Sequence, residues 1–314
     1  MSKLAIIGTG YVGLTTGAVM AHLGHTVTCA DLDAGKVARL SQADLHIYEP
    51  GLRDLVVEGL ASGRLRFVVG AAAAATDCEF AFLCVQTPQG DAGEADLTWV
   101  LAAAHELGTV VPPSTVVINK STVPVGSAGR VAAALGRDDV TVASNPEFLR
   151  EGTAVADCLS PDRIVVGAPD RSVAEAVAAL YIGITAPVVL TDVTSAEMIK
   201  YASNAFLAVK LSYVNEIATL CEQVGADALD VVLGMGYDQR IGKDALKPGP
   251  GWGGSCLPKD TAALSHMAAS AGSPPSSSAC SSASWWAPSH PCSGRPASRV
   301  GAQCTGPSCW SRRW

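Results

Sequence analysis

The run Gly8-Thr9-Gly10-Tyr11-Val12-Gly13 is the feature that most restricts how this chain can fold. It has the form G-x-G-x-x-G and separates an apolar segment, residues 4–8, from a helix-like segment, residues 14–23. The first glycine permits a tight turn, the second lets the backbone approach a ligand, and the third lets a helix pack closely on a strand. The pattern predicts a strand, a turn and a helix that open a parallel α/β sheet.

Strand-like and helix-like segments alternate from residue 1 to about residue 150, which is typical of a doubly wound parallel sheet. We therefore expect a Rossmann domain over residues 1–190. Residues 191–272 are expected to form a helical central domain. It opens with one helix over residues 192–225, of roughly 50 Å at 1.5 Å per residue, long enough to connect domains or form a subunit interface. Strands are expected at residues 4–8, 26–30, 80–85, 116–120 and 140–144.

Asp31 indicates which dinucleotide the glycine turn would bind. It ends the second expected strand, about 20 residues after the turn, where a carboxylate accepts hydrogen bonds from ribose hydroxyls and repels a 2′-phosphate. NAD is therefore expected rather than NADP, with its pyrophosphate at the helix N terminus. Lys36 is expected near the adenosine end. Cofactor contacts are expected from Gly8, Gly10, Tyr11, Val12, Gly13, Asp31, Lys36, Thr87, Thr122, Glu151 and Lys259.

Cys256 lies in a second glycine-rich segment, residues 249–260. Four glycines precede it, and Lys259 and Asp260 follow within one turn. A cysteine near a cation at a helix N terminus has a lowered pKa and acts as a thiolate nucleophile. A buried structural cysteine in a Gly-Pro turn is the alternative that this segment alone leaves open.

The composition argues against several classes of protein. A formal net charge of −7 and the low pI do not fit a nucleic-acid partner or an anionic membrane surface. No apolar run reaches the ~18 residues of a membrane helix, and the N terminus enters a strand pattern at once, so the cytoplasm is expected. No metal site is expected, because the six histidines form no pair at ligand spacing. The scattered cysteines other than Cys256 are expected to be small buried side chains.

Residues 273–314 depart from the rest of the chain. They contain four arginines and no Asp, Glu, Lys, Leu, Ile, Phe, Tyr or Met. A segment without aliphatic periodicity cannot bury much surface, so we expect it to be disordered, and its composition favours an out-of-frame translation. Its four cysteines are expected to form no site.

Five segments closely resemble the UDP-glucose/GDP-mannose dehydrogenase family. They are the glycine turn and residues 121–126, 145–152, 200–206 and 253–260. The resemblance extends from residue 1 to about residue 272. It implies that a second α/β domain should follow the helical region, so we expect that domain to be missing and the substrate cleft to lack one wall.

The resemblance implies an NAD-dependent four-electron oxidation of UDP-glucose to UDP-glucuronate. The aldehyde formed first would be attacked by Cys256 to give a thiohemiacetal, then a thioester that water hydrolyses. Ser255 and the sequence Pro258-Lys259-Asp260 favour UDP-glucose over UDP-N-acetylhexosamines, whereas GDP-mannose stays open. A 6-phosphogluconate-type dehydrogenase shares the Rossmann domain and long helix but needs no such cysteine. An inactive NAD-binding relic is the third alternative.

The resemblance also assigns roles to individual residues. Lys200 and Asn204, four positions apart on one helix face, would stabilise negative charge on the substrate oxygen. Asp260 and Thr122 would hold a water molecule, and Glu151 and Glu147 are candidate acid–base groups. Arg240 is expected to come from a neighbouring subunit, which implies a homodimer built on the long helix. The implied contacts to the UDP-sugar are Phe148, Leu149, Arg150, Glu151, Lys200, Asn204, Arg240, Ala245, Leu246, Lys247, Pro248, Gly249 and Gly253.

Overall fold

The structure is a computed structural model that describes residues 1–273. The expectations about residues 274–314, including their disorder, the frame change and the four cysteines, lie outside the described residues.

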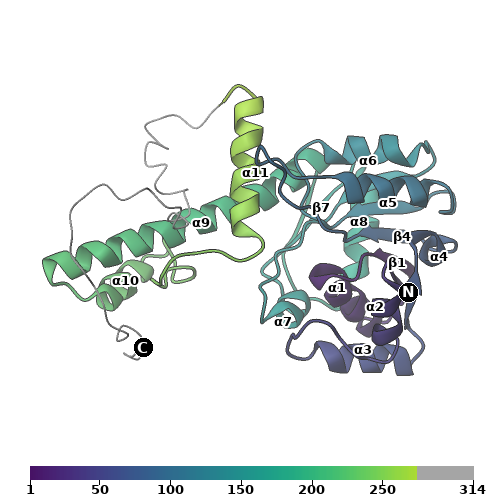
Figure 1. Ribbon diagram of the computed structural model, residues 1–314, viewed down its shortest axis with the longest axis horizontal. Helices are drawn as coiled ribbons and strands as arrows, with labels where there is room; N and C mark the ends of the chain where they lie inside the picture. Colours follow the sequence, from purple (N-terminus) through teal and green to yellow (C-terminus); the bar gives the residue numbers. More distant parts are fainter. Residues whose placement is uncertain (274–314) are drawn as a thin grey trace, which may run out of the picture.

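Eight strands form one sheet in the order β3-β2-β1-β4-β5-β6-β7-β8 (Figure 1). The order reverses between β1 and β4, and in open α/β sheets ligands bind at such a switch point, outside the carboxyl ends of the strands. The strands are β1 (Lys3–Ile7), β2 (Thr26–Asp31), β3 (Leu65–Val69), β4 (Phe80–Leu83), β5 (Val116–Asn119), β6 (Thr141–Ser144), β7 (Ile164–Gly167) and β8 (Val188–Thr191).

The expected Rossmann sheet is confirmed, with one correction to its strand directions. Strands β1 to β6 are parallel, but β7 is antiparallel to β6 through the pair Ser144 and Gly167, and β8 is parallel to β7. The sequence pattern had not indicated β3, β7 or β8.

Helices cover both faces of the sheet, and two hydrophobic cores result. Ile6 belongs to one core and Ile7 to the other, because successive side chains of a strand point to opposite faces. Helices α1 (Tyr11–His22), α2 (Ala34–Leu40), α3 (Leu52–Ala61), α7 (Ala154–Leu159) and α8 (Arg171–Ala178), with the short 3₁₀ turn η1 (Ala179–Tyr181), pack on the first face. Helices α4 (Ala71–Ala75), α5 (Thr98–Gly108) and α6 (Ser127–Leu135) pack on the second.

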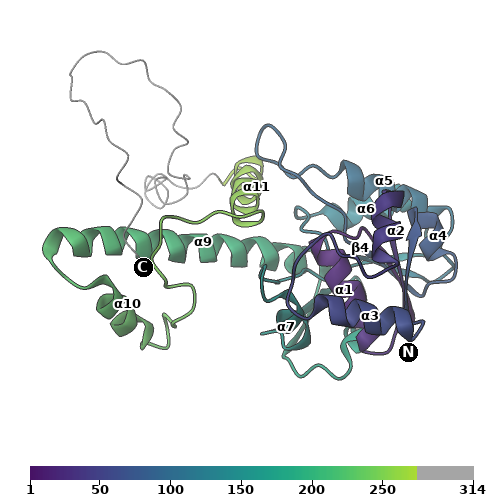
Figure 2. The same cartoon turned by 60° about the horizontal axis from the view of Figure 1, so that its bottom comes forward.

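The long helix is confirmed as α9 (Val193–Val224), which extends away from the sheet (Figure 2). The Asp192 side chain caps its start by accepting a hydrogen bond from Ser195 N at 2.8 Å. Gly225, in the left-handed conformation with φ 76°, ends it. Helix α10 (Ala228–Gly236) packs near its far end, and α11 (Leu257–Ser270) packs against its half nearest the sheet (Figure 1).

Most of the described cysteines lie inside the fold. Cys29, Cys78, Cys84 and Cys221 are buried, whereas Cys158 and Cys256 are half-buried. Burial raises the pKa of Cys78 and Cys84 to about 12, so both are neutral thiols at physiological pH. In residues 1–273, no helix has both the length and the apolar character needed to cross a membrane.

Candidate active site

The glycine turn between β1 and α1 leaves room for a phosphate group. Gly8 has φ +98°, and a Cβ atom on Gly13 would lie 1.9 Å from the Gly8 carbonyl oxygen, so neither position tolerates a side chain. A Cβ on Gly10 would meet nothing within 4 Å, which shows that the turn is open on the ligand side. Within residues 1–273 no side chain caps the N terminus of α1, so its backbone N–H groups are available to an anion.

Asp31 lies beside this turn at the end of β2. Its Oδ2 accepts hydrogen bonds from Thr9 Oγ1 at 2.6 Å, from Thr9 N at 3.1 Å and from Lys36 Nζ at 2.8 Å. Burial opposes ionisation, but the bonds from Lys36 and Thr9 outweigh it and lower the pKa of Asp31 to about 2. The carboxylate is therefore charged, as recognition of ribose hydroxyls requires, and Lys36 pairs with it.

Glu49 is a site residue that the sequence analysis missed. Its side chain is 5% exposed and accepts hydrogen bonds from Tyr11 Oη, from Gly152 N at 2.9 Å and from Ala154 N at 2.5 Å. Burial and Glu49 together raise the pKa of Tyr11 to about 12. The carboxylate thus connects the glycine turn with the segment that carries Glu151. A lone glutamate before a Pro-Gly turn gives no sequence signal of this role.

The loops after β4 and β5 are bonded to each other. Thr87 Oγ1 donates to the carbonyl oxygen of Thr122 at 2.9 Å, and Ser121 Oγ donates to that of Val85 at 2.6 Å. Both loops follow the carboxyl ends of neighbouring parallel strands, so Thr87 and Thr122 lie together at the ligand-binding edge.

Lys200 on α9 is buried against the segment after β6. Its Nζ donates to Glu147 Oε1 at 2.8 Å and to the Glu147 carbonyl oxygen at 2.6 Å, and both side chains are at most 6% exposed. Burial alone would raise the pKa of Glu147, but the Lys200 ammonium lowers it below its usual range. Glu147 is therefore held as a carboxylate, which suits it to position Lys200 and makes it a poor proton donor.

Asn204, one turn further along α9, contacts α11. Its Nδ2 donates to Asp260 Oδ2 at 2.6 Å, and Asp260 is 1% exposed. The other carboxylate oxygen of Asp260 accepts a bond from Lys259 Nζ at 2.5 Å. The sequence pattern predicts Lys259 as the cation beside the cysteine. In the structure its ammonium is instead directed to Asp260.

Cys256 is the N-cap residue of α11, at the helix N terminus. Its Sγ lies 3.5 Å from Ser255 Oγ, and that hydroxyl donates to Glu151 Oε1 at 2.7 Å. The chain Glu151–Ser255–Cys256 thus links the cysteine loop to the segment after β6. The sequence pattern marks Ser255 as part of a motif and does not predict this contact.

The residues implied for the sugar nucleotide fall into two groups. Phe148 lies near the site, with the Arg163 guanidinium 3.6 Å and Lys200 Nζ 5.4 Å from the centre of its ring. Arg163 was not expected there, because nothing in its local sequence marks it. Arg150 is paired with Asp157 at 2.5 Å, and its side chain is 75% exposed.

The second group lies along α9, in the loop before Cys256. Lys210 Nζ donates to the carbonyl oxygen of Asp244 at 2.7 Å, and Gly249 N donates to Asn215 Oδ1 at 2.8 Å. Arg240 is paired with Asp238 at 2.6 Å, and its side chain is 89% exposed. Within this loop Leu246 is 2% exposed, Ala245 has φ 57°, and a Cβ on Gly253 would meet nothing within 4 Å.

Comparison with known sequences identifies the family to which this arrangement belongs. Residues 2–185 match the NAD binding domain of the UDP-glucose/GDP-mannose dehydrogenase family, and residues 194–282 match its central domain. The chain belongs to the UDP-glucose/GDP-mannose dehydrogenase family. The resemblance expected from the five segments is confirmed, and so is NAD as the cofactor of the Rossmann domain.

Individual members of the family resemble the chain over most of its described length. A UDP-glucose 6-dehydrogenase of Bacillus subtilis is 47% identical over 279 residues, and one of Pseudomonas aeruginosa is 45% identical over 281 residues. These matches cover 87% and 85% of this chain but 60% and 61% of the relatives. The chain therefore spans about three fifths of the length of these curated relatives.

Solved structures of family members share the fold. The UDP-glucose dehydrogenase of Pyrobaculum islandicum superposes with a TM-score of 0.82 at 41% identity, covering 87% of this chain and 65% of that one. A GDP-mannose dehydrogenase of Pseudomonas aeruginosa superposes with a TM-score of 0.72 at 32% identity, covering 85% and 64%.

Proposed function

We propose that this chain oxidises UDP-glucose to UDP-glucuronate with NAD, using Cys256 as the nucleophile. The proposal is supported by three hydrogen bonds that bring the polar groups of one site together. Lys200 is bonded to Glu147, and Asn204 is bonded to Asp260. Ser255 is bonded to Glu151, and its hydroxyl lies 3.5 Å from the Cys256 sulfur. The site adjoins the glycine turn through Glu49.

The proposed reaction balances as two oxidations and one hydrolysis. Removal of a hydride from C6 and a proton from the attached oxygen gives an aldehyde. The Cys256 sulfur then adds to the aldehyde carbon, and the oxygen takes a proton to give a thiohemiacetal. A second hydride and proton leave, which gives a thioester. Water attacks the carbonyl carbon, the C–S bond breaks, and the acid and the free cysteine are released. NAD supplies the hydride acceptor in both oxidations.

Side chains on α9, on α11 and in the segment after β6 perform the remaining steps in this proposal. The Lys200 ammonium and the Asn204 amide stabilise negative charge on the substrate oxygen. Asp260, held as a hydrogen-bond acceptor between Asn204 and Lys259, orients the water molecule. Glu151, directed toward the cysteine loop through Ser255, accepts the proton during hydrolysis.

UDP-glucose is favoured over GDP-mannose as the substrate because the relatives that are 45–47% identical are named UDP-glucose 6-dehydrogenases. The test is the rate of NADH formation with UDP-glucose, GDP-mannose and UDP-N-acetylglucosamine at equal concentrations. We expect turnover with UDP-glucose above that with the other two. Tight NAD binding without turnover of any of the three sugar nucleotides would instead show that the chain binds the cofactor but does not catalyse the oxidation.

We further propose that two copies associate along α9. Large apolar side chains are exposed on α9, on α10 and directly after α10, including Phe206, Leu220, Val224, Leu229 and Tyr237, each more than 50% exposed. A second copy would cover this surface, and Arg240 of each copy would then lie at the active site of the other. Sedimentation equilibrium should give twice the chain mass, and Leu220→Glu with Val224→Glu should give the single mass. A single mass for the unaltered chain would contradict the proposal.

We also propose a cytoplasmic location for the chain. The proposal is supported by the six described cysteines, all free thiols, since exported proteins commonly pair theirs. Fractionation of cells, with detection of the chain, tests it.

A further inference from the structure

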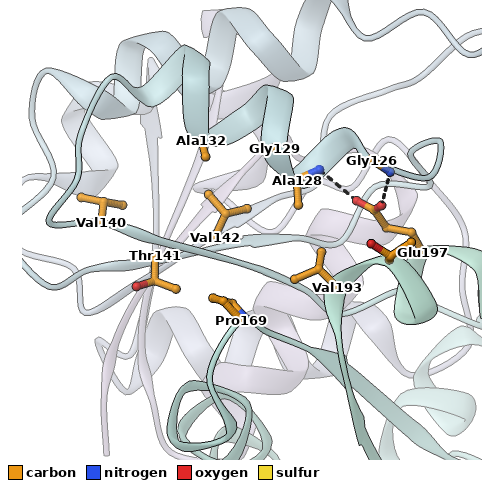
Figure 3. A pocket seen from close by; sticks show the side chains of 11 residues that line it. Gly126, Ala128, Gly129, Ala132, Val140, Thr141, Val142, Pro169, Val193 and Glu197 are labelled. Carbon is orange, nitrogen blue, oxygen red and sulfur yellow. Dashed lines mark hydrogen bonds between the residues drawn. The ribbon is translucent and has the colours of Figure 1, made fainter.

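Glu197 is a buried acid on α9 to which the proposed reaction gives no role. It is 2% exposed and lies in the first turns of the helix. It lines a cavity of about 390 Å³ bounded by α6, β6 and the start of α9 (Figure 3). The other lining residues are small or apolar, including Gly129, Ala132 and Val142. A carboxylate in such surroundings needs specific partners, because burying a charge is costly.

Its partners are backbone amides at the start of α6. Glu197 Oε2 accepts a hydrogen bond from Gly126 N at 2.6 Å, and Oε1 accepts one from Ala128 N at 2.9 Å (Figure 3). The N-cap residue of α6 is Gly126 itself, with φ 90° and no side chain to cap the helix. Glu197 therefore caps α6 from another element, where the helix dipole favours an anion.

This cap joins the elements that carry the proposed reaction. Glu197 precedes Lys200 by three positions and Asn204 by seven on the same helix, so all three lie on one side of α9. The amides that it binds continue directly from the loop of Thr122. The same loop also contacts α11, where Val125 N donates to Met267 Sδ at 3.4 Å.

We propose that Glu197 is a positioning residue, whose carboxylate fixes the Thr122 loop against α9 and so sets the placement of Thr122 relative to Lys200 and Asn204. The effect on turnover rests on the proposed oxidation, whereas the contact itself does not. A displacement of about 1 Å in such a constellation is enough to lower a rate by roughly a hundredfold.

The surroundings of Glu197 oppose its ionisation. Among the described residues that line the cavity, Glu197 is the titratable one. Burial is the main cause that raises the pKa of Glu197 to about 7, and the amides of residues 126–128 only partly offset it. The charged or titratable groups on the elements around it are Arg130 on α6, Lys200 and Tyr201 in the first three turns of α9 after the N-cap residue Asp192, and Lys259, Asp260 and His266 on α11.

Protonation of Glu197 converts one acceptor oxygen into a hydroxyl that faces an N–H group. One of the two hydrogen bonds to the amides is then lost, while the cost of burying a charge is removed. Glu197→Gln imitates the protonated state with the same shape, because its amide nitrogen likewise faces an N–H group.

Hydrogen exchange of the amides of Gly126 and Ala128 tests the contact directly in the full chain. At pH 8, after correction for intrinsic rates, we expect these amides to be several-fold less protected in Glu197→Gln than in the unaltered protein. Glu175→Gln is the matched control, since Glu175 is an exposed residue of α8 that is paired with Arg171 on the same helix. Equal protection of these amides in Glu197→Gln and in the unaltered protein would overturn the proposal.

Turnover gives the second readout. We expect Glu197→Gln to lower kcat roughly tenfold while the KM for UDP-glucose stays within about twofold. An unchanged kcat together with lost protection would show a purely structural cap and overturn the positioning role. If the unaltered chain forms no NADH, the proposed oxidation fails, and the exchange experiment still decides whether Glu197 holds the loop.

Discussion

Asn204 and Asp260 are joined by a hydrogen bond of 2.6 Å from Nδ2 to Oδ2, although 56 positions separate them in the chain. This bond fixes α11, which starts at the cysteine loop, against the helix that carries Lys200. The second oxygen of Asp260 is bound by Lys259, so the carboxylate has a charged partner on one side and a neutral one on the other. Its position depends on both helices.

Asp260→Asn should disturb this junction with little change in shape. The amide that replaces the carboxylate has one acceptor oxygen instead of two, so either Asn204 or Lys259 loses its hydrogen-bond partner. This loss lowers the free energy of unfolding by about 1–3 kcal/mol. We expect a lower melting temperature and a kcat reduced at least tenfold, with NAD affinity kept. Asp54→Asn, at an exposed position of α3, is the control and should change neither quantity.

Glu49→Gln tests the connection between the glycine turn and the segment of Glu151. The variant keeps one acceptor oxygen for three donors, so at least one of them is left unsatisfied. We expect a loss of about 1–3 kcal/mol, which corresponds to a fall of roughly 3–10 °C in Tm by calorimetry. Glu58→Gln removes only exposed ion pairs and should leave Tm within about 1 °C. Equal Tm values for the two variants would contradict the role of Glu49.

Asp31→Ala should weaken NAD binding and relax the discrimination against NADP. Loss of hydrogen bonds to a charged acceptor costs about 1.5–3 kcal/mol, or roughly tenfold to a hundredfold in Kd. The Kd for NADP should fall or stay constant, because the carboxylate no longer repels the 2′-phosphate. Titrations that follow cofactor binding by protein fluorescence measure both constants. If the Kd for NAD is unchanged in the variant, the ribose does not bind at Asp31 and this prediction is wrong.

Asp31 also contributes to the acid stability of the fold. Its pKa in the folded chain, about 2, is below the 3.8 of an unperturbed aspartate. The unfolded state therefore binds the proton first, so this contribution is present above pH 4 and is lost as the pH falls toward 2. The free energy of unfolding of Asp31→Asn should depend less on pH over this interval than that of the unaltered chain.

Local sequence determines the parts of the fold that were predicted. The glycine turn and Asp31 are recognisable because steric limits on the backbone admit glycine alone at Gly8 and Gly13. The limits of α9 follow from Asp192 and Gly225, whose capping acts within a few residues. The reversed direction of β7 was not predictable, because a strand's direction depends on the path of the connection before it.

The contacts that assemble the site were not predictable for a related reason. Glu49 bonds residues 38 to 105 positions away, and Glu197 bonds amides about 70 positions away. No periodicity or spacing in the sequence encodes such partners. Lys259 was placed by sequence near the cysteine, yet its long side chain turns to Asp260.

Cys256→Ala separates cofactor binding from acid formation. The variant keeps the Rossmann domain intact, so its Kd for NAD should equal that of the unaltered chain. It lacks the sulfur that captures the aldehyde, so UDP-glucuronate should be absent when products are resolved by chromatography. Formation of the acid at the normal rate by this variant would rule out the thioester route.

The central claim concerns two oxidations at one site, and the ratio of NADH formed to UDP-glucose consumed measures it directly. The reaction is run to completion with excess NAD, and NADH is read by absorbance while the sugar nucleotides are separated and counted. The proposed mechanism predicts two NADH for each UDP-glucose, with UDP-glucuronate as the product. One NADH for each UDP-glucose, with an aldehyde as the final product, would contradict it.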